Sequence, residues 1–600
     1  MKKKTLINTF SVLTLTSLFS FAGLNNVNAQ PVNESVKVNK VNINNEFALG
    51  MDISSIISLE KGGVTYYDEN GKKEDLFKLC SENGTNYIRV RIWNNPKNSK
   101  GVFYGGGNND LNTAIQIGKR ATNANMKVLV DLHYSDFWTD PGKFIAPKDW
   151  SKLDPSAVSG KIYDWTKEVL DKFAAEKINV GMIQIGNEIN TGFVSQYTWS
   201  PGNGGLLNEN YCNYLNSGLS AVSDFNNAHN TSIKKVLHFT EPNKACGTIF
   251  AKLEKCGVKD YDVFATSYYP DIHGDLDSLY STLMQIGDTT KKQIMVAEYN
   301  YPYIGSSDKS KYPFGVSVKG QASFIRSLVN TVNSIDYNFD NVSDGIGVFY
   351  WEPAWPKISE WEKYGTGWAN KSASDYLDHQ NNGFGFGQTP TDRISLFASK
   401  SNNRQQMLDS FKTYKYLKIG KKKLNTIKSI SISKNSEKIS LKWSKSSGAS
   451  TYKIYRSDGT NGIFTLIGTT AKTSYTDKNV KAGHTYLYSV KAFAANGIDS
   501  SDGTDEITIY VPKTIKKINA KKKNGKTKLK WKKDSYVSGY IVYKSNKSNG
   551  KYKVLKTIKS ASKNSYSIKS NKKAFYKVRA FYQIGKKKIF GKLSKAVKVK

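Results

Sequence analysis

Eight short apolar segments, separated by longer amphipathic stretches, occupy residues 47–417 of this 600-residue chain. We expect these segments to be strands, at 47–55, 85–93, 127–136, 180–190, 235–241, 263–270, 293–302 and 347–353. Spacers such as 110–124, 158–177 and 318–335 have the periodicity of helices. Eight strand–helix units predict an α/β fold, a (β/α)8 TIM barrel. The alternative, a doubly wound open sheet, usually carries a glycine-rich phosphate loop after its first strand, and Met51-Asp52-Ile53-Ser54 offers none.

Polar or aromatic side chains stand at the carboxyl ends of seven of these eight segments. They are Arg89, Arg91, His133, Tyr134, Asp136, Asn187, Glu188, His238, Glu241, Tyr268, Tyr269, Glu298, Trp351 and Glu352. In a (β/α)8 barrel these ends converge on one mouth, where active sites of this fold are built. The sequence therefore predicts a functional site at the mouth.

Two of these residues, Glu188 and Glu298, end the fourth and seventh segments within nearly uncharged runs, where a buried carboxylate without a purpose would be costly. Cleavage of a glycosidic bond with retention needs two carboxyl groups about 5–5.5 Å apart. We expect Glu188 to be the acid/base and Glu298 the nucleophile. The alternative is a pair of structural carboxylates held by Arg89 or Arg91, although either arginine could also keep the nucleophile ionised.

Several neighbouring side chains are predicted to bind the substrate. Asn187 precedes the acid/base and can hydrogen-bond a sugar hydroxyl. The remaining candidates are Arg89, Arg91, His133 and five aromatic residues that could stack on sugar faces: Trp93, Tyr134, Trp138, Tyr269 and Trp351. For the tryptophans the alternative is packing, and for His133 it is a hydrogen-bonded buried side chain.

Long motifs around these residues resemble glycoside hydrolase family 53, in the right order over about residues 46–417. They are Met51-Asp52-Ile53-Ser54-Ser55, Tyr87-Ile88-Arg89-Val90-Arg91-Ile92-Trp93-Asn94, Gly105-Gly106-Gly107-Asn108-Asn109-Asp110-Leu111, Val130-Asp131-Leu132-His133-Tyr134-Ser135-Asp136-Phe137-Trp138, Gln184-Ile185-Gly186-Asn187-Glu188-Ile189-Asn190, Ser267-Tyr268-Tyr269-Pro270 and Phe349-Tyr350-Trp351-Glu352-Pro353-Ala354-Trp355. The resemblance implies an arabinogalactan endo-β-1,4-galactanase that hydrolyses galactan side chains of pectin without a cofactor. Carried over by motif, Glu188 is the proton donor and Glu298 the nucleophile.

The chain departs from the family pattern in three places. Glu298 is followed by Tyr299-Asn300-Tyr301 where the family usually has Thr-Ser-Tyr. Bacterial members often bind a structural Ca²⁺ after the seventh strand, but here 304–320 contains only Asp308 as a carboxylate, so we expect no metal. The loop 370–388, with Asp375 and Asp378, also diverges. Two alternative functions remain open: hydrolysis of another β-glycan (mannan, xylan or glucan), and a non-catalytic carbohydrate-binding or cell-surface protein.

The amino terminus predicts export. Lys2, Lys3 and Lys4 precede an apolar run at 6–24 and the small-residue site Val27-Asn28-Ala29. This is typical of a secretory signal at 1–29, followed by a linker at 30–45. The alternative is a membrane anchor, but polar residues interrupt the run, and no other stretch approaches the roughly 18 apolar residues of a span.

The cysteines do not suggest a metal site. Cys80, Cys212, Cys246 and Cys256 include no Cys-x-x-Cys pair, and the six histidines do not cluster with them. They are too few for a disulfide framework in a chain of this length, and Cys246–Cys256 is one candidate bridge.

Residues 421–600 differ in composition from the predicted barrel at 46–420. Two stretches, 421–512 and 513–600, each begin with a strand carrying one tryptophan, Trp443 and Trp531, and continue with a Tyr-x-x-Tyr strand. Alternating strands in about 90 residues predict an all-β, immunoglobulin-like sandwich of seven strands. Both stretches resemble fibronectin type III modules.

The last of these modules, 513–600, contains 30 lysines and arginines but one acidic residue. A charge this lopsided attracts polyanions. The signal peptide argues against nucleic acid as the natural ligand and favours pectin's galacturonate backbone or anionic cell-wall teichoic polymers. The alternative is a spacer whose lysines only confer solubility.

Overall fold

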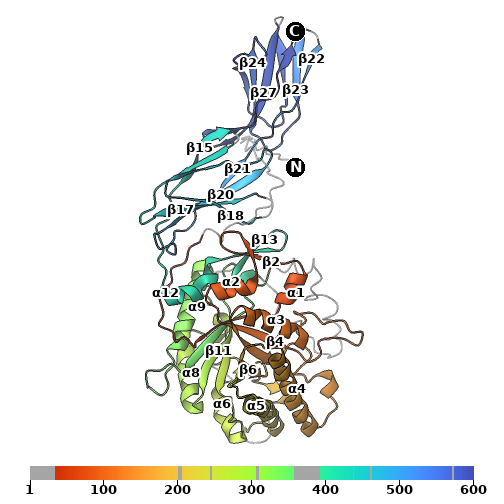
Figure 1. Cartoon of the computed structure of the whole chain (residues 1–600), viewed down its shortest axis with the longest axis vertical. Helices are drawn as coiled ribbons and strands as arrows, with labels where there is room; N and C mark the ends of the chain where they lie inside the picture. The colour runs from red at the N-terminus through yellow and green to blue at the C-terminus, as the bar shows by residue number, and fades with distance from the viewer. Residues whose placement is uncertain are drawn as a thin grey trace, which may run out of the picture.

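The structure, a computed structural model, describes residues 34–599 except 200–205, 243–245, 306–307, 309, 357–391, 437, 460–461, 524 and 570–572. The predicted signal peptide at 1–29 and the divergent loop at 370–388 lie outside the described residues. The molecule is elongated, with a barrel at one end and two β-sandwiches stacked in sequence order toward the carboxyl terminus (Figure 1).

Eight parallel strands close into a barrel in the order β1-β12-β11-β10-β9-β6-β5-β4, as the sequence predicts. Their bounds are β1 Ala48–Asp52, β4 Tyr87–Ile92, β5 Lys127–Leu132, β6 Val180–Ile185, β9 Lys234–Phe239, β10 Val263–Tyr268, β11 Gln293–Tyr299 and β12 Gly345–Trp351. Nearly every strand residue is buried, because helices cover the outside and side chains fill the inside. Gly50 leaves room for that filling, since a Cβ there would lie 2.1 Å from the Phe349 ring.

Helices pack around the barrel (Figure 1), and most of them begin at a side-chain cap. Asp110, Asp154 and Asp275 each accept a hydrogen bond from a backbone N–H of the first turn, which satisfies a donor that the helix leaves free. The helices are α1 Ile56–Lys61, α2 Leu76–Glu82, α3 Leu111–Asn123, α4 Pro155–Ala175, α5 Glu209–His229, α6 Cys246–Leu253, α7 Pro270–His273, α8 Leu276–Thr290, α9 Val318–Asn333 and α12 Thr413–Ile419.

One disulfide joins two of the outer helical segments. Cys212 in α5 is bonded to Cys256 in the short helix η3 (Glu254–Cys256), with 6.2 Å between their Cα atoms. The candidate bridge Cys246–Cys256 is therefore wrong. Cys80 is free and buried. Pairing depends on which helices the barrel sets side by side, and sequence spacing does not report that.

Two small sheets lie outside the barrel strands. One has the order β13-β14-β2-β3 and the other pairs β7 with β8. Their strands are β13 Phe397–Lys400, β14 Arg404–Met407, β2 Thr65–Tyr67, β3 Lys73–Glu74, β7 Gly192–Phe193 and β8 Gln196–Tyr197.

The first sandwich has the seven strands that the sequence predicts, in sheets β15-β16-β19 and β18-β17-β20-β21. They are β15 Ile430–Ser436, β16 Lys438–Trp443, β17 Thr451–Ser457, β18 Thr465–Thr470, β19 Ser474–Asp477, β20 Thr485–Phe493 and β21 Ile507–Tyr510. Trp443 is buried in its core.

The second sandwich has eight strands, so the prediction of seven is wrong there. Its sheets are β22-β23-β26 and β25-β24-β27-β28, with β29 also pairing with β27. The strands are β22 Ile518–Lys523, β23 Lys526–Trp531, β24 Gly539–Ser545, β25 Lys553–Ile558, β26 Ser565–Lys569, β27 Ala574–Ile584, β28 Lys587–Phe590 and β29 Val597–Val599. The long β27 pairs with β28 at its carboxyl end and with β29 at its amino end, so two short strands share its edge.

The three bodies contact one another through specific groups. Gln406 of β14 exchanges two hydrogen bonds with the backbone of Phe464 in the first sandwich, and Lys421 forms a buried ion pair with Asp409. Between the sandwiches, the Tyr510 hydroxyl donates to the Asp534 carboxylate at 2.9 Å, and Ile589 of the second sandwich packs into the core of the first. These contacts set the sandwiches in line with the barrel rather than on a free tether.

Candidate active site

The two predicted carboxyl residues lie at the carboxyl ends of the fourth and seventh barrel strands. Glu188 follows β6 and has φ 48°, a left-handed conformation that costs energy for a residue with a Cβ and is enriched at functional sites. Glu298 lies within β11, where the pairing with β10 shifts register just before Ser267 and Glu298. Such a bulge re-aims side chains and here brings Glu298 level with Ser267 at the mouth.

Glu298 is buried, with 7% of its surface exposed, and is held from two sides. Arg89 Nη1, from β4, lies 2.8 Å from Glu298 Oε1. The Tyr269 hydroxyl donates to Glu298 Oε2 at 2.8 Å. Both contacts favour the charged form of the carboxylate. They also fix the direction in which its oxygens point.

Glu188 is half-buried and is oriented by a different set of groups. The Ser267 hydroxyl donates to Glu188 Oε1 at 2.6 Å. Ser267 Oγ in turn lies 2.9 Å from His238 Nε2, while His238 Nδ1 faces the Glu188 backbone N–H and the Gln184 amide. The Ser267 hydroxyl gives its single hydrogen to Glu188, so its Oγ accepts from His238, which places the proton of the neutral ring on Nε2.

The environment separates the two carboxyl groups in their affinity for a proton. Burial, and next the negative charge of Glu298, raise the pKa of Glu188 to about 8. Burial raises the pKa of Glu298 as well, but Arg89 and the Tyr269 hydroxyl oppose that rise. The pKa of His238 lies well below its ordinary value, through burial and then the Arg89 charge, so the ring stays neutral. Glu188 therefore keeps its proton up to about pH 8, while Arg89 and the Tyr269 hydroxyl favour the ionised form of Glu298.

Arg89 is the centre of a buried charge network. Its guanidinium also donates to Asp52 Oδ2 at 2.8 Å, to Asp131 Oδ2 at 2.9 Å and to Asn187 Oδ1 at 2.9 Å. Burial lowers the pKa of Arg89, but the charges of Asp131, Glu298 and Asp52 more than reverse that effect. Arg89 thus binds both Glu298, the predicted nucleophile, and Asn187, the residue before the predicted acid/base.

Asn187 and His133 lie at the mouth with most of their polar atoms engaged. The Asn187 amide donates to the Thr139 carbonyl at 2.8 Å. His133 Nδ1 accepts from the Thr139 N–H at 3.0 Å, so its Nε2–H is the donor to Asp131 at 3.1 Å. His133 is 3% exposed, which agrees with the alternative of a hydrogen-bonded buried histidine.

The five predicted aromatic platforms divide into two groups. Tyr269 is half-buried beside Glu298, while Trp138 and Trp351 keep 8% and 6% of their surfaces exposed, and these three stay predicted sugar contacts. Trp93 and Tyr134 are fully buried at 0%. We therefore reassign both to packing, because neither offers a face to a sugar.

Arg91 stabilises the wall of the mouth. Its Nη1 donates to Glu352 Oε1 at 2.7 Å, and Nη2 donates to the Ser55 hydroxyl at 3.0 Å. The guanidinium also lies over the Trp138 ring, 4.2 Å from its centroid. Arg91 is 1% exposed, so the structure supports a role in positioning Trp138 rather than direct contact with a substrate.

From the sequence, His238 was placed at the mouth without a role, and none was assigned to Asp52, Asp131, Gln184 or Ser267, although all five help to orient Glu188 or Glu298. His238 carried a signal, since it stands near the end of a predicted strand. Ser267 carried almost none. Its contact with Glu188 depends on the pairing of β9, β10 and β11.

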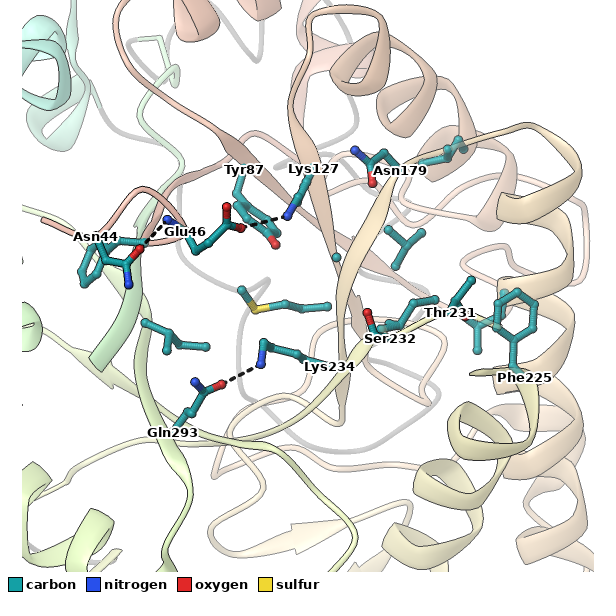
Figure 2. A pocket seen from close by; sticks show the side chains of 18 of the residues that line it. Asn44, Glu46, Tyr87, Lys127, Asn179, Phe225, Thr231, Ser232, Lys234 and Gln293 are labelled. Atoms are coloured by element: carbon teal, nitrogen blue, oxygen red, sulfur yellow. Dashed lines mark hydrogen bonds and ion pairs between the residues drawn. The ribbon is translucent and has the colours of Figure 1, made fainter. Parts of the chain in front are cut away.

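A hollow of about 780 Å³ lies at the end of the barrel opposite the mouth, where the strands begin (Figure 2). Tyr87, Lys127, Lys234 and Gln293 line it, each at or beside the start of its strand. The acidic residue lining it, Glu46, lies 3.3 Å from Lys127. Lacking a pair of carboxyl groups, it does not fit glycosidic cleavage.

Within the residues described, no three His, Cys, Asp or Glu side chains are grouped so that they could hold a metal ion. Asp308 lies in the loop where bacterial family members often bind calcium, and it accepts hydrogen bonds from the Ser310 backbone and hydroxyl. The absence of calcium stays a prediction. In the same described part of the chain, none of the helices has the length and apolarity to span a bilayer.

Two glutamates at the mouth of a (β/α)8 barrel, one with its pKa raised to about 8 and the other paired with an arginine, are suited to acid-assisted cleavage of a glycosidic bond. The fold and the site together define a barrel glycoside hydrolase. The family model described as glycosyl hydrolase family 53 matches residues 48–385. The chain belongs to this family.

Individual relatives agree with that assignment. An endo-β-1,4-galactanase of Bacillus subtilis (strain 168) is 41% identical over 387 residues, covering 61% of this chain and 85% of the relative. An arabinogalactan endo-β-1,4-galactanase of Cellvibrio japonicus is 33% identical, covering 56% of this chain and 89% of the relative. The solved GH53 catalytic domain of Ignisphaera aggregans is 31% identical with a TM-score of 0.53, covering 64% of this chain and 99% of that structure.

Proposed function

We propose that this chain is a secreted endo-β-1,4-galactanase that cleaves internal β-1,4-galactosidic bonds in the arabinogalactan side chains of pectin. The observation that carries the proposal is the pair Glu188 and Glu298 at one mouth, where the pKa of Glu188 is raised to about 8 and Glu298 is held by Arg89 and Tyr269. Two relatives that cover this barrel bear the names endo-β-1,4-galactanase and arabinogalactan endo-β-1,4-galactanase, which supports the substrate.

The first step forms a covalent intermediate. Glu298 attacks the anomeric carbon while the bond from that carbon to the leaving oxygen breaks, and Glu188 gives its proton to that oxygen. Arg89 and Tyr269 keep Glu298 charged and aimed before the attack. As the ester forms, the negative charge on Glu298 disappears. The pKa of Glu188 therefore falls, and its carboxylate form becomes available to act as a base.

The second step releases the sugar. Glu188, now a carboxylate, removes a proton from water, and the water oxygen attacks the anomeric carbon as the ester bond to Glu298 breaks. Two inversions at the same carbon leave the product with the β configuration of the substrate. The Ser267 hydrogen bond keeps Glu188 in place through both of its roles.

Substrate and stereochemistry can be tested together. On linear β-1,4-galactan we expect the viscosity to fall well before most reducing ends appear, and the first product seen by NMR to be the β anomer. Mannan, xylan and glucan serve as matched polymers. Faster hydrolysis of mannan, xylan or glucan than of galactan would identify that polymer as the substrate instead. An initial α product would contradict retention. Absence of activity on all four polymers would favour a non-catalytic binding protein.

Export is the part of this proposal that rests on the amino terminus alone. The charged start, apolar run and small residues at 27–29 support cleavage after Ala29. Amino-terminal sequencing of protein recovered from the medium should begin at Gln30. Protein that stays with the cells and begins at Met1 would contradict export.

The pH profile follows from the two carboxyl groups. Glu188 must be protonated to act as an acid, and its raised pKa of about 8 means that it loses the proton only above that pH. We expect kcat/KM to fall about tenfold per pH unit above roughly pH 8. Ser267→Ala removes a hydrogen bond that lowers the pKa of Glu188, so the alkaline limb should move to higher pH.

An aryl galactoside with a good leaving group is the control, because its departure needs little protonation. Its kcat/KM should be much less sensitive to alkaline pH. An alkaline limb near pH 5, or identical limbs for wild type and Ser267→Ala, would contradict the assignment of Glu188 as the acid.

A further inference from the structure

The second sandwich presents a sheet face on which most of the paired positions are lysines. In β23, Lys526, Lys528 and Lys530 are exposed, while the alternating residues Leu529 and Trp531 are buried in the core. This is the period-two pattern of a strand with one face in water. The outward face of the β22-β23-β26 sheet therefore concentrates charge that the composition alone could not place.

The register of this sheet sets like charges directly opposite one another. Lys521 of β22 pairs with Lys528 of β23, and Lys526 of β23 pairs with Lys569 of β26. Directly opposed like charges destabilise a sheet. Such an arrangement is relieved when an anion lies across the strands, which points to a ligand rather than to a solubilising surface.

Beside these strands lies a groove of about 1120 Å³, and eight of its fourteen lining residues are lysines. They include Lys517, Lys521, Lys528 and Lys530. The acidic residue in the lining, Asp534, accepts hydrogen bonds from the Tyr510 hydroxyl and the Lys513 backbone N–H. Its carboxylate is thus engaged in joining the two sandwiches.

The chemistry of the lining narrows the class of ligand. The aromatic residue there, Trp531, is 3% exposed, so the groove offers no ring on which a base or a neutral sugar could stack. Single-stranded nucleic acid is usually held by such stacking. Lysine is a point charge without the fixed fork of arginine, which suits a flexible chain of anionic groups whose spacing need not match a rigid pattern.

We propose that this lysine groove binds an unbranched polyuronate, a polysaccharide with one carboxylate on each sugar. The choice of a polysaccharide over a phosphate polymer rests on the proposed function. Galactan side chains are attached to pectin, whose backbone is a polyuronate, so binding that backbone raises the effective concentration of galactan at the barrel. Figure 1 places the second sandwich at the far end of the molecule from the barrel, so a polymer held there leaves the mouth accessible.

The test measures binding of the full-length protein to polygalacturonate by affinity electrophoresis and by calorimetry at low salt. The groove variant is Lys521→Gln, Lys528→Gln and Lys530→Gln. The matched control, Lys553→Gln, Lys556→Gln and Lys559→Gln, removes the same charge from exposed positions on and just after β25, in the other sheet. We expect the groove variant to lose at least about tenfold in affinity and the control to lose less than about twofold, with wild-type binding weakening as salt is added.

Equal losses of affinity in the two variants would show that net charge alone attracts the polymer, and would overturn the assignment of the groove as the binding site. The wild-type protein is also compared on a polyglycerol phosphate and on single-stranded RNA at equal charge concentration. Tighter binding to either of these than to polygalacturonate would overturn the assignment of a polyuronate as the ligand. No binding to polygalacturonate would overturn the proposal outright. Hydrolysis of soluble galactan is measured separately and should be unchanged in both variants, so failure of the galactanase assignment shows in that assay and not in binding. Melting temperatures confirm that both variants are folded.

Discussion

Glu298→Ala is expected to lower kcat on galactan by about 10³-fold or more while leaving affinity for the polymer nearly unchanged. The substitution removes the atom that attacks the anomeric carbon but leaves Tyr269 and the aromatic residues of the mouth in place. Rates on soluble galactan and binding by calorimetry measure the two effects separately.

The space left by the carboxylate provides a sharper test. With an activated aryl galactoside, added azide should restore turnover and give a galactosyl azide of inverted configuration, because the small anion attacks from the position of Glu298. Glu60→Gln is the control, since Glu60 pairs with Arg120 outside the mouth and its loss should leave kcat within about twofold. Near-normal activity of Glu298→Ala would rule out the nucleophile.

Arg89→Met is expected to have the largest effect on stability. Arg89 is 1% exposed and pairs with Asp52, Asp131 and Glu298, so its removal leaves buried carboxylates without their counter-charge. Breaking a buried ion pair from one side costs about 3–5 kcal/mol in the free energy of unfolding at neutral pH. Denaturant unfolding at pH 7 and at pH 5 measures this loss, which should shrink at the lower pH as the carboxylates take up protons.

The same substitution changes activity in a defined direction. Without Arg89 the pKa of Glu298 rises further, so a larger fraction of the nucleophile is protonated at acid pH and the acidic limb of kcat/KM moves upward. Arg89→Lys keeps a charge and should show a smaller shift. Arg120→Met, which removes a partly exposed ion pair, should cost no more than about 1 kcal/mol. An unchanged acidic limb in Arg89→Met would refute the proposed role.

Much of the barrel could be predicted from the sequence because its signals are local. A buried strand is a short run of β-branched and small residues, and the polar residues that interrupt it or follow it mark the mouth. Glu188 and Glu298 stand out in this way, and so does Arg89. The same logic gave the first sandwich its seven strands.

The direction in which a side chain points was harder to predict from the sequence. His133, just after β5, lies on the same face of the chain as Asp131 within that strand, whereas Tyr134 lies on the other face and bonds to Thr166 of α4. Trp93 lies past the end of β4 and is enclosed by Phe137 and Trp138. A shift of one residue moves a side chain to the other face of the strand. The periodicity of a strand also does not predict the conformation of the loop that follows it.

The sequence by itself determined the alternation of strands and helices, the place of Glu188 and Glu298 at the ends of the fourth and seventh strands and the excess of lysine in the last module, because each depends on residue type and spacing along the chain. Only the tertiary structure decided that Ser267 and His238 orient Glu188, that Cys256 pairs with Cys212, and that the lysines of β22 and β23 stand opposite one another around a groove. Those features arise between segments distant in sequence, and their contacts exist only once strand register and helix packing have been fixed.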